Sequence, residues 1–260
     1  MKPKWIGSGW KMNLTMAQAR HFAESLHDYY ADESPSTQVF IVPPFPYLLT
    51  VGELLQGTPV RLAAQNMHWE DSGAFTGEVS PVMLKDCGVR IVELGHAERR
   101  TLFGETDQII NRKVLATLKH GMRPLICVGE SRDDKQCDVG VETLSRQLKI
   151  ALMGVSEERV SQVMIAYEPV WAIGVGGEPA DPAYCGSLHT EIRNVLAGLF
   201  GAAHAGEIPI LYGGSVDLTN AGSYLQQDQV DGLFVGRAAR KVEDFIKLIE
   251  MANTLSSAEV

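Results

Sequence analysis

The sequence is poor in cysteine, in basic charge and in long apolar runs. Its 260 residues include four cysteines, none of which forms a Cys-x-x-Cys pair, so neither a disulfide framework nor a zinc site is predicted. The 23 Lys and Arg against 32 Asp and Glu give a net charge of −9, which argues against a nucleic-acid partner or an anionic membrane surface. No stretch has the length and apolarity of a signal peptide or a membrane-spanning helix. We therefore expect a cytoplasmic protein with reduced thiols that binds neither nucleic acid nor membrane.

The chain is instead rich in short apolar segments of β type. Hydrophobic residues make up 45% and charged residues 21%, as in an ordinary globular protein. The expected strands are residues 5–10, 39–42, 61–64, 89–94, 124–128, 163–167, 209–212 and 232–235. Each is brief and almost continuously apolar, which is typical of strands buried on both faces of a parallel sheet.

Amphipathic stretches separate these strands. Apolar residues spaced by three and four predict helices around residues 19–29, 110–118, 141–151, 188–199 and 242–249, with Gly121 ending the second. The connections after the third and seventh strands are expected to hold short or irregular helices. The turn after the first strand, residues 7–11, lacks the Gly-x-Gly-x-x-Gly pattern of a doubly wound sheet, whereas eight strands fit a closed (β/α)8 barrel. No linker divides the chain, so residues 1–260 are predicted to form a single domain.

Candidate catalytic residues follow three of the expected strands. In a (β/α)8 barrel the chemistry gathers at the C-terminal ends of the strands, where this sequence places Lys11, His96 and Glu168. A partly buried carboxylate can serve as a base, a histidine at a helix N-terminus favours its neutral form, and a lysine can hold a developing negative charge. Each also has a commonplace interpretation as a solvated lysine, a structural histidine or a salt-bridged glutamate. Together they predict proton transfer beside a carbonyl group, through an enediolate.

Glycine-rich turns follow the last two strands, at residues 213–215 and at residues 236–237. Glycines leave backbone N–H groups accessible to an anion, and a phosphate site after the seventh and eighth strands recurs in these barrels. One such turn would more often be purely structural, but two on adjacent strands favour phosphate binding. The residues alone leave open an isomerase, another phosphate-binding barrel enzyme such as a lyase or an epimerase, and a non-catalytic barrel that binds phosphorylated metabolites.

Longer motifs cover nearly the whole chain in a fixed order. They are residues 10–13, 73–78, 94–100, 103–105, 127–130, 166–174 and 212–216. In these motifs the sequence resembles the triosephosphate isomerase family. The resemblance implies a TIM barrel and an obligate homodimer, and we expect neither cofactor nor metal. It gives Glu168 the role of base, His96 that of electrophile, Lys11 that of electrostatic element and Glu98 a supporting role.

The resemblance also implies where the substrate phosphate and the second subunit lie. Phosphate contacts are expected at Gly174, Gly214, Ser215, Gly236 and Arg237. The loop of residues 73–80 matches the family's dimer loop, and its Thr76 is expected near the site of the partner subunit.

The sequence departs from the family pattern at four places in or beside the expected site. Gly9 stands where the family has an Asn whose amide reaches the substrate oxygens, which removes a donor and opens space. Ala97 replaces a Ser that holds the base in the open enzyme, and the lid of residues 173–179 has altered hinges. Arg237 replaces a Gly and adds a fork of donors, unless it faces outward into solvent. The proton-transfer groups stay while the substrate-shaping groups change, which predicts the same chemistry on another phosphosugar.

Two segments, residues 5–7 and 232–237, resemble the bacterial erythrulose-phosphate isomerase branch of the family. That branch interconverts L-erythrulose 1-phosphate and D-erythrulose 4-phosphate in tetritol breakdown, and the space at Gly9 suits the extra hydroxymethyl group. The alternative is a true triosephosphate isomerase of glycolysis, which converts dihydroxyacetone phosphate to glyceraldehyde 3-phosphate. A further alternative is a non-catalytic phosphosugar-binding barrel.

Overall fold

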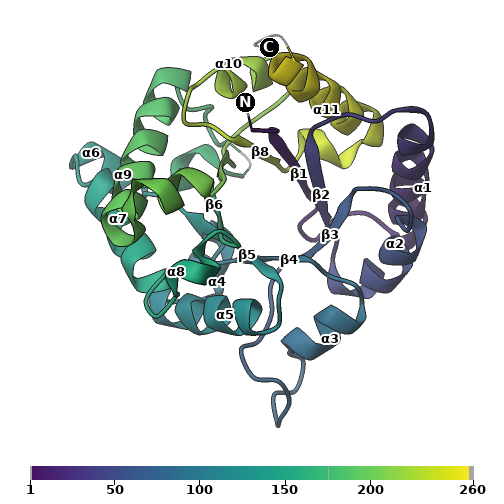
Figure 1. The fold of residues 1–260 in the computed structure, drawn as a ribbon, viewed down its shortest axis with the longest axis horizontal. Coiled ribbons are helices and arrows are strands. Elements are labelled where there is room, and N and C mark those ends of the chain that lie inside the picture. The colour runs from purple at the N-terminus through teal and green to yellow at the C-terminus, as the bar shows by residue number, and fades with distance from the viewer. Residues whose placement is uncertain (1, 175, 258–260) are drawn as a thin grey trace.

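Eight parallel strands close into a barrel in the computed structural model, which describes residues 2–174 and 176–257 (Figure 1). Each strand pairs with the next along the chain, and β8 pairs with β1. The strands are β1 (Trp5–Gly9), β2 (Gln38–Val42), β3 (Arg61–Ala64), β4 (Ile91–Leu94), β5 (Arg123–Val128), β6 (Met164–Tyr167), β7 (Ile210–Tyr212) and β8 (Gly232–Val235). The predicted (β/α)8 fold class is confirmed. That the domain extends over all of residues 1–260 stays a prediction.

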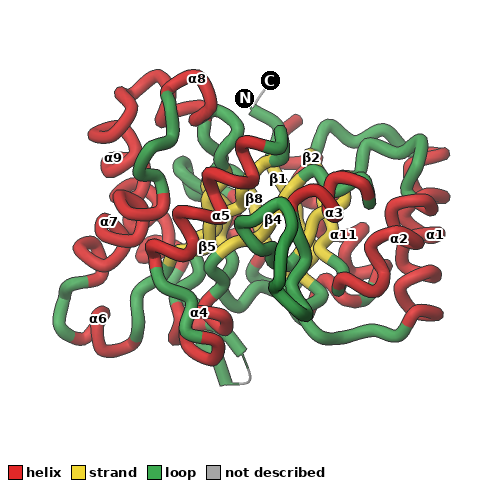
Figure 2. Tube along the Cα trace, turned by 90° about the horizontal axis from the view of Figure 1, so that it is seen from below, coloured by secondary structure: helices red, strands yellow, loops and turns green. Residues whose placement is uncertain are grey.

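Helices surround the strands as an outer ring (Figures 1 and 2). They are α1 (Met16–Asp32), α2 (Leu48–Leu54), α3 (Pro81–Asp86), α4 (Ala97–Phe103), α5 (Asp107–Lys119), α6 (Arg132–Gln136), α7 (Gly140–Ala151), α8 (Glu157–Val160), α9 (Pro182–Glu207), α10 (Ala221–Leu225) and α11 (Val242–Ser257). Three short 3₁₀ turns are η1 (Phe45–Tyr47), η2 (Val170–Ala172) and η3 (Ala238–Arg240). The five predicted helices correspond to α1, α5, α7, α9 and α11. The connections after β3 and β7 contain the short helices α3 and α10, as predicted.

Local sequence signals fix several helix ends. Thr15 and Gln18 form a capping box at the start of α1, in which each side chain accepts a hydrogen bond from the other's backbone N–H. Helix α5 stops just before Gly121, whose φ of +70° favours glycine. Helix α9 begins earlier than predicted because Asp181 caps it and Pro182 is its first residue, six residues before the apolar periodicity becomes clear.

The buried core has two parts, one inside the barrel and one between the strands and the helices. Successive strand residues point to opposite sides, so Ile91 of β4 packs inside the barrel and Val92 packs toward the helices. The next inward position of β4 is Glu93, a buried carboxyl in an otherwise apolar strand. In the part of the chain that the structure describes, no helix is long and apolar enough to cross a membrane.

Candidate active site

A cavity of about 450 Å³ opens where the strands end. Lys11 after β1, His96 after β4 and Glu168 after β6 all line it. The other predicted site residues of this chain that line it are Glu98, Gly174, Gly214, Ser215, Gly236 and Arg237. Thr76, which was predicted to serve the partner's site, lies on an exposed loop and is not part of this lining. The barrel thus brings residues from distant parts of the sequence to one pocket.

His96 is held in a defined hydrogen-bonding state by the first turn of α4. Its Nδ1 accepts a hydrogen bond from the backbone N–H of Glu98 at 3.1 Å. A ring nitrogen that accepts carries no proton, so the neutral ring has its proton on Nε2. Because Nε2 lies 3.7 Å from Glu168 Oε2, the donor of His96 points toward the pocket and the carboxyl group of Glu168.

Glu168 presents a carboxyl group with spare hydrogen-bonding capacity. Its side chain is 3% exposed, and its backbone N–H donates to the Val128 carbonyl at 2.7 Å, which anchors it to the neighbouring strand. Among the described residues, Oε2 has no hydrogen-bond partner. A Cβ at Gly213 would lie 2.8 Å from Glu168 Cγ, so the glycine of the turn after β7 makes room for this side chain. An unpartnered carboxyl oxygen beside a cavity is the arrangement that proton abstraction needs.

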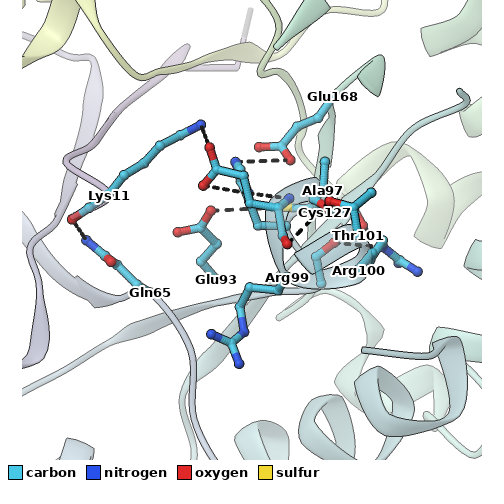
Figure 3. A network of polar contacts seen from close by, with 12 residues as sticks. Lys11, Gln65, Glu93, Ala97, Arg99, Arg100, Thr101, Cys127 and Glu168 are labelled. Carbon is cyan, nitrogen blue, oxygen red and sulfur yellow. Dashed lines mark hydrogen bonds and ion pairs between the residues drawn. The ribbon is translucent and has the colours of Figure 1, made fainter. Parts of the chain in front are cut away.

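Lys11 and Glu98 form an ion pair at the mouth of the pocket, with 2.7 Å between Nζ and Oε1. Gln65 Nε2 donates to the Lys11 carbonyl at 2.8 Å, which fixes the backbone where the lysine has a φ of +51°. The other Glu98 oxygen is 3.6 Å from His96 Nδ1. Figure 3 shows Lys11 and Glu168 directed toward the same space, so an ammonium group and a carboxyl group share the pocket.

The predicted lid follows a segment held by hydrogen bonds to Glu130. Glu130 is fully buried, and its Oε1 accepts from the Tyr167 hydroxyl, the Trp171 indole and the Tyr184 hydroxyl at 3.0, 2.9 and 3.1 Å. These bonds join β5, β6, η2 and α9 just ahead of Gly174. Val175, which belongs to the predicted lid, lies outside the described residues.

Arg237 contacts the lid. Its side chain is exposed, and its guanidinium donates to the Gly174 carbonyl at 2.8 Å. The sequence left open whether this residue faces the substrate or the solvent. In the structure its guanidinium contacts the backbone of the predicted lid, and Arg237 also lines the cavity.

The space at Gly9 is narrower than the sequence suggested. Gly9 lines the pocket, but a Cβ built there would lie 3.1 Å from a ring atom of Phe234. The two residues come from β1 and β8, which are neighbours in the barrel although distant in the sequence. The Phe234 ring therefore takes part of the room that a missing side chain leaves.

Sequence reasoning missed Glu93, which also lines the pocket and is 6% exposed. Burial raises the pKa of this carboxyl well above its usual range, and the charge of Glu168 raises it further. The available signal was a carboxylate in an apolar strand, two residues after the inward-facing Ile91.

Glu93, His96 and Glu168 each bring one ligand atom within 4.8 Å of the others, which is close enough for a metal ion. Metal binding would require Glu93 and His96 Nε2 to lose their protons, against the state that their surroundings favour. The expectation of a site without metal or cofactor stays a prediction.

The fold and this pocket define an enzyme of the (β/α)8 class with its acid and base groups at the strand ends. A sequence model of the family described as triosephosphate isomerase matches residues 4–252, so the chain belongs to the triosephosphate isomerase family and is an isomerase.

Similar proteins of known name cover almost the full length of the chain. It is 47% identical over 246 residues to L-erythrulose-1-phosphate isomerase of Rhizobium rhizogenes, across 94% of this chain and 93% of that protein. It is 45% identical to the protein of that name from Brucella abortus, across 96% of each, and 43% identical to that from Rhizobium meliloti, across 95% of each. The resemblance predicted from the motifs is confirmed.

Proposed function

We propose that this chain isomerises a four-carbon ketose phosphate, L-erythrulose 1-phosphate to D-erythrulose 4-phosphate, through an enediolate and without metal or cofactor. The observation that carries the proposal is the unpartnered Glu168 Oε2, 3.7 Å from the proton-bearing Nε2 of His96. A base and a hydrogen-bond donor at that separation can act on a carbon and on an oxygen of one small substrate.

The reaction moves a carbonyl group from C2 to C3. Glu168 takes the proton from C3, and the electron pair left behind makes the C2–C3 double bond while O2 becomes negative. His96 Nε2–H donates to that oxygen, and the Lys11 ammonium stabilises its charge. Protonation of O2 and loss of the O3 proton give the other enediolate. The Glu168 carboxylic acid then returns its proton to C2, and O3 becomes the new carbonyl oxygen, so no atom is gained or lost.

The phosphate is assigned to the turns after β7 and β8 and to Gly174. Gly214 and Ser215 follow β7, Gly236 and Arg237 follow β8, and Gly174 belongs to the lid. Backbone N–H groups in such turns suit an anion, and the Arg237 fork adds charge. A substrate anchored there extends its carbon chain toward Glu168 and His96.

A proton-exchange experiment tests the base. In deuterium oxide, a bound ketose phosphate should take up solvent deuterium at carbon with the wild-type protein. Glu168→Gln should still bind the substrate analogue 2-phosphoglycolate but lose the exchange, whereas Glu157→Gln, on the exposed helix α8, should keep both. Unchanged exchange in Glu168→Gln would contradict the base assignment. No exchange in the wild type with any ketose phosphate of three to five carbons would favour the non-catalytic alternative.

The choice of substrate is tested by kcat/KM. The names of the relatives and the missing side chain at Gly9 support the four-carbon substrate over dihydroxyacetone phosphate. One further carbon group in a fitted pocket changes kcat/KM by about 10- to 200-fold. We expect a preference of that size for erythrulose 1-phosphate, and a preference for the triose would identify a true triosephosphate isomerase. As part of the same proposal, the enzyme acts in tetritol breakdown and is cytoplasmic.

We also propose a homodimer built on the loop of residues 73–80. Support comes from large apolar side chains left exposed in one copy: Met12 is 96%, Leu102 73% and Phe103 68% exposed. Thr76 would then approach the site of the partner subunit. Sedimentation should show a dimer for the wild type and for Thr190→Arg, on the exposed side of α9, and a monomer for Thr76→Arg. A wild-type monomer, or a dimeric Thr76→Arg, would contradict this arrangement.

A further inference from the structure

Glu93 is a buried carboxyl group that the reaction described above does not use. It occupies an inward-facing position of β4, after Ile91, in a barrel interior that is otherwise apolar at this strand. Among the described residues its side chain has one hydrogen-bond contact, with the Cys127 thiol 4.0 Å from Oε1. A carboxyl group in such surroundings is unfavourable unless it is hydrogen-bonded. Because Glu93 also lines the pocket, a bound substrate can supply the missing partner.

The surroundings decide which chemical form of Glu93 meets that substrate. Burial and the neighbouring Glu168 charge both raise its pKa well above the usual range, and the opposing effect of the Lys11 charge is smaller. Both effects favour the uncharged form of Glu93, which has one O–H donor and one accepting oxygen. That pair of functions matches a hydroxyl group, which both donates and accepts. It does not match a phosphate group, which needs cationic or N–H donors.

The other groups of the substrate already have partners. The phosphate is assigned to the turns after β7 and β8, the reacting carbon to Glu168, and the enediolate oxygens to His96 and Lys11. The remaining group of a four-carbon ketose phosphate is the terminal hydroxymethyl, at the end away from the phosphate. Among the strand residues that line the pocket, those that face inward are Gly9, Phe234 and Glu93, and Figure 3 shows Glu93 beside the space that Lys11 and Glu168 share.

We propose that Glu93 is a substrate-binding residue that determines specificity, because its carboxyl group exchanges hydrogen bonds with the terminal hydroxyl of the four-carbon substrate. This inference rests on the four-carbon substrate of the proposed function and adds the residue that recognises its fourth carbon.

The test compares two substrates that differ by one oxygen atom, L-erythrulose 1-phosphate and its 4-deoxy analogue, which ends in a methyl group. The wild type should prefer the hydroxyl substrate in kcat/KM by about 10- to 100-fold, as for a buried hydrogen-bonding group left unpaired. Glu93→Leu should abolish that preference, mainly by losing activity on the hydroxyl substrate. Glu93→Gln should keep most of it, because an amide also donates and accepts. Binding of 2-phosphoglycolate checks that each variant keeps its pocket.

Three results would overturn the role of Glu93. The first is a wild type that turns over both substrates equally well, a result that does not depend on whether any variant folds. The second is a Glu93→Leu that loses the same factor on both substrates, which would place Glu93 at the reacting carbons or in the fold. The third is a Glu93→Leu that keeps the full preference. Failure of the proposed function is seen separately, as a wild type without turnover of erythrulose 1-phosphate but with turnover of dihydroxyacetone phosphate.

Discussion

Replacing Gly213 by alanine tests how the turn after β7 positions the proposed base. The new Cβ would lie 2.8 Å from Glu168 Cγ and 3.2 Å from its Oε1. Both atoms belong to a side chain that can rotate, so the carboxyl group gives way rather than the barrel. The backbone of Gly213 does not have the positive φ that would itself disfavour alanine.

The size of the effect follows from the overlap. Carbon atoms in contact prefer about 3.5–4.0 Å, so Cγ has to move by roughly 1 Å. A displacement of about 1 Å in a catalytic group can cost about 100-fold in rate. That factor corresponds to about 2.7 kcal/mol in activation free energy.

The assay measures kcat on the preferred ketose phosphate together with the melting temperature. Gly213→Ala should lose kcat and keep its melting temperature. Gly198→Ala is the control, because a Cβ at that position of α9 meets nothing within 4 Å. A wild-type kcat in Gly213→Ala would refute the reasoning, and a large fall in melting temperature would show that the barrel moved instead of Glu168.

Three further predictions concern charge. Lys11→Met should lower kcat by about 100- to 1000-fold, as for loss of an oxyanion-stabilising group. Lys149→Met, at an exposed position of α7, should leave kcat unchanged. If both variants had the same kcat, Lys11 would have no part in the mechanism. Burial lowers the pKa of the His189 imidazole to about 3. Below pH about 6.5 this histidine therefore binds a proton in the unfolded chain but not in the folded one. The free energy of unfolding should then fall by up to about 1.4 kcal/mol per pH unit on acidification. Urea unfolding between pH 7 and 5 should show that the free energy of unfolding falls less steeply with pH in His189→Gln than in the wild type. The same dependence on pH in both proteins would contradict this. Lys113→Met removes the ammonium partner of the buried Glu105, which keeps only the Arg99 guanidinium, and should reduce the free energy of unfolding by about 1.5–3 kcal/mol, with part of the loss restored by adding Glu105→Gln; an unchanged urea midpoint would count against it.

The strands could be predicted closely because a strand buried on both faces is a short apolar run. The prediction for β4 began two residues early, at Val89, because the Val89 N–H bonds to Leu84 and completes the end of α3. Helices α4 and α6 have seven and five residues, too few for an apolar period to stand out. Local pattern therefore identifies elements that make several turns or lie fully buried, and it misses those that depend on capping and connection.

The sequence likewise predicts some features of the site and not others. That Lys11, His96 and Glu168 share one rim follows from their places after strands, because parallel strands of a barrel end on one face. The contact of Gly9 with Phe234 and the bond from Arg237 to Gly174 do not follow. They depend on how the barrel closes and how far a flexible side chain reaches, which the order of residues does not encode.

The roles proposed for two buried carboxyl groups of the pocket, Glu93 and Glu168, let one barrel change substrate and keep its chemistry. Ligand atoms of Glu93 and Glu168 lie within 4.8 Å of each other. Burial and the nearby charge of Glu168 both raise the pKa of Glu93, which favours the protonated form of this carboxyl group. A base for the C–H bond and an uncharged group for a hydroxyl thus arise from two identical side chains. On this argument, Glu93→Asp should weaken recognition of the hydroxyl by withdrawing the carboxyl from the substrate, and leave turnover of the 4-deoxy substrate intact.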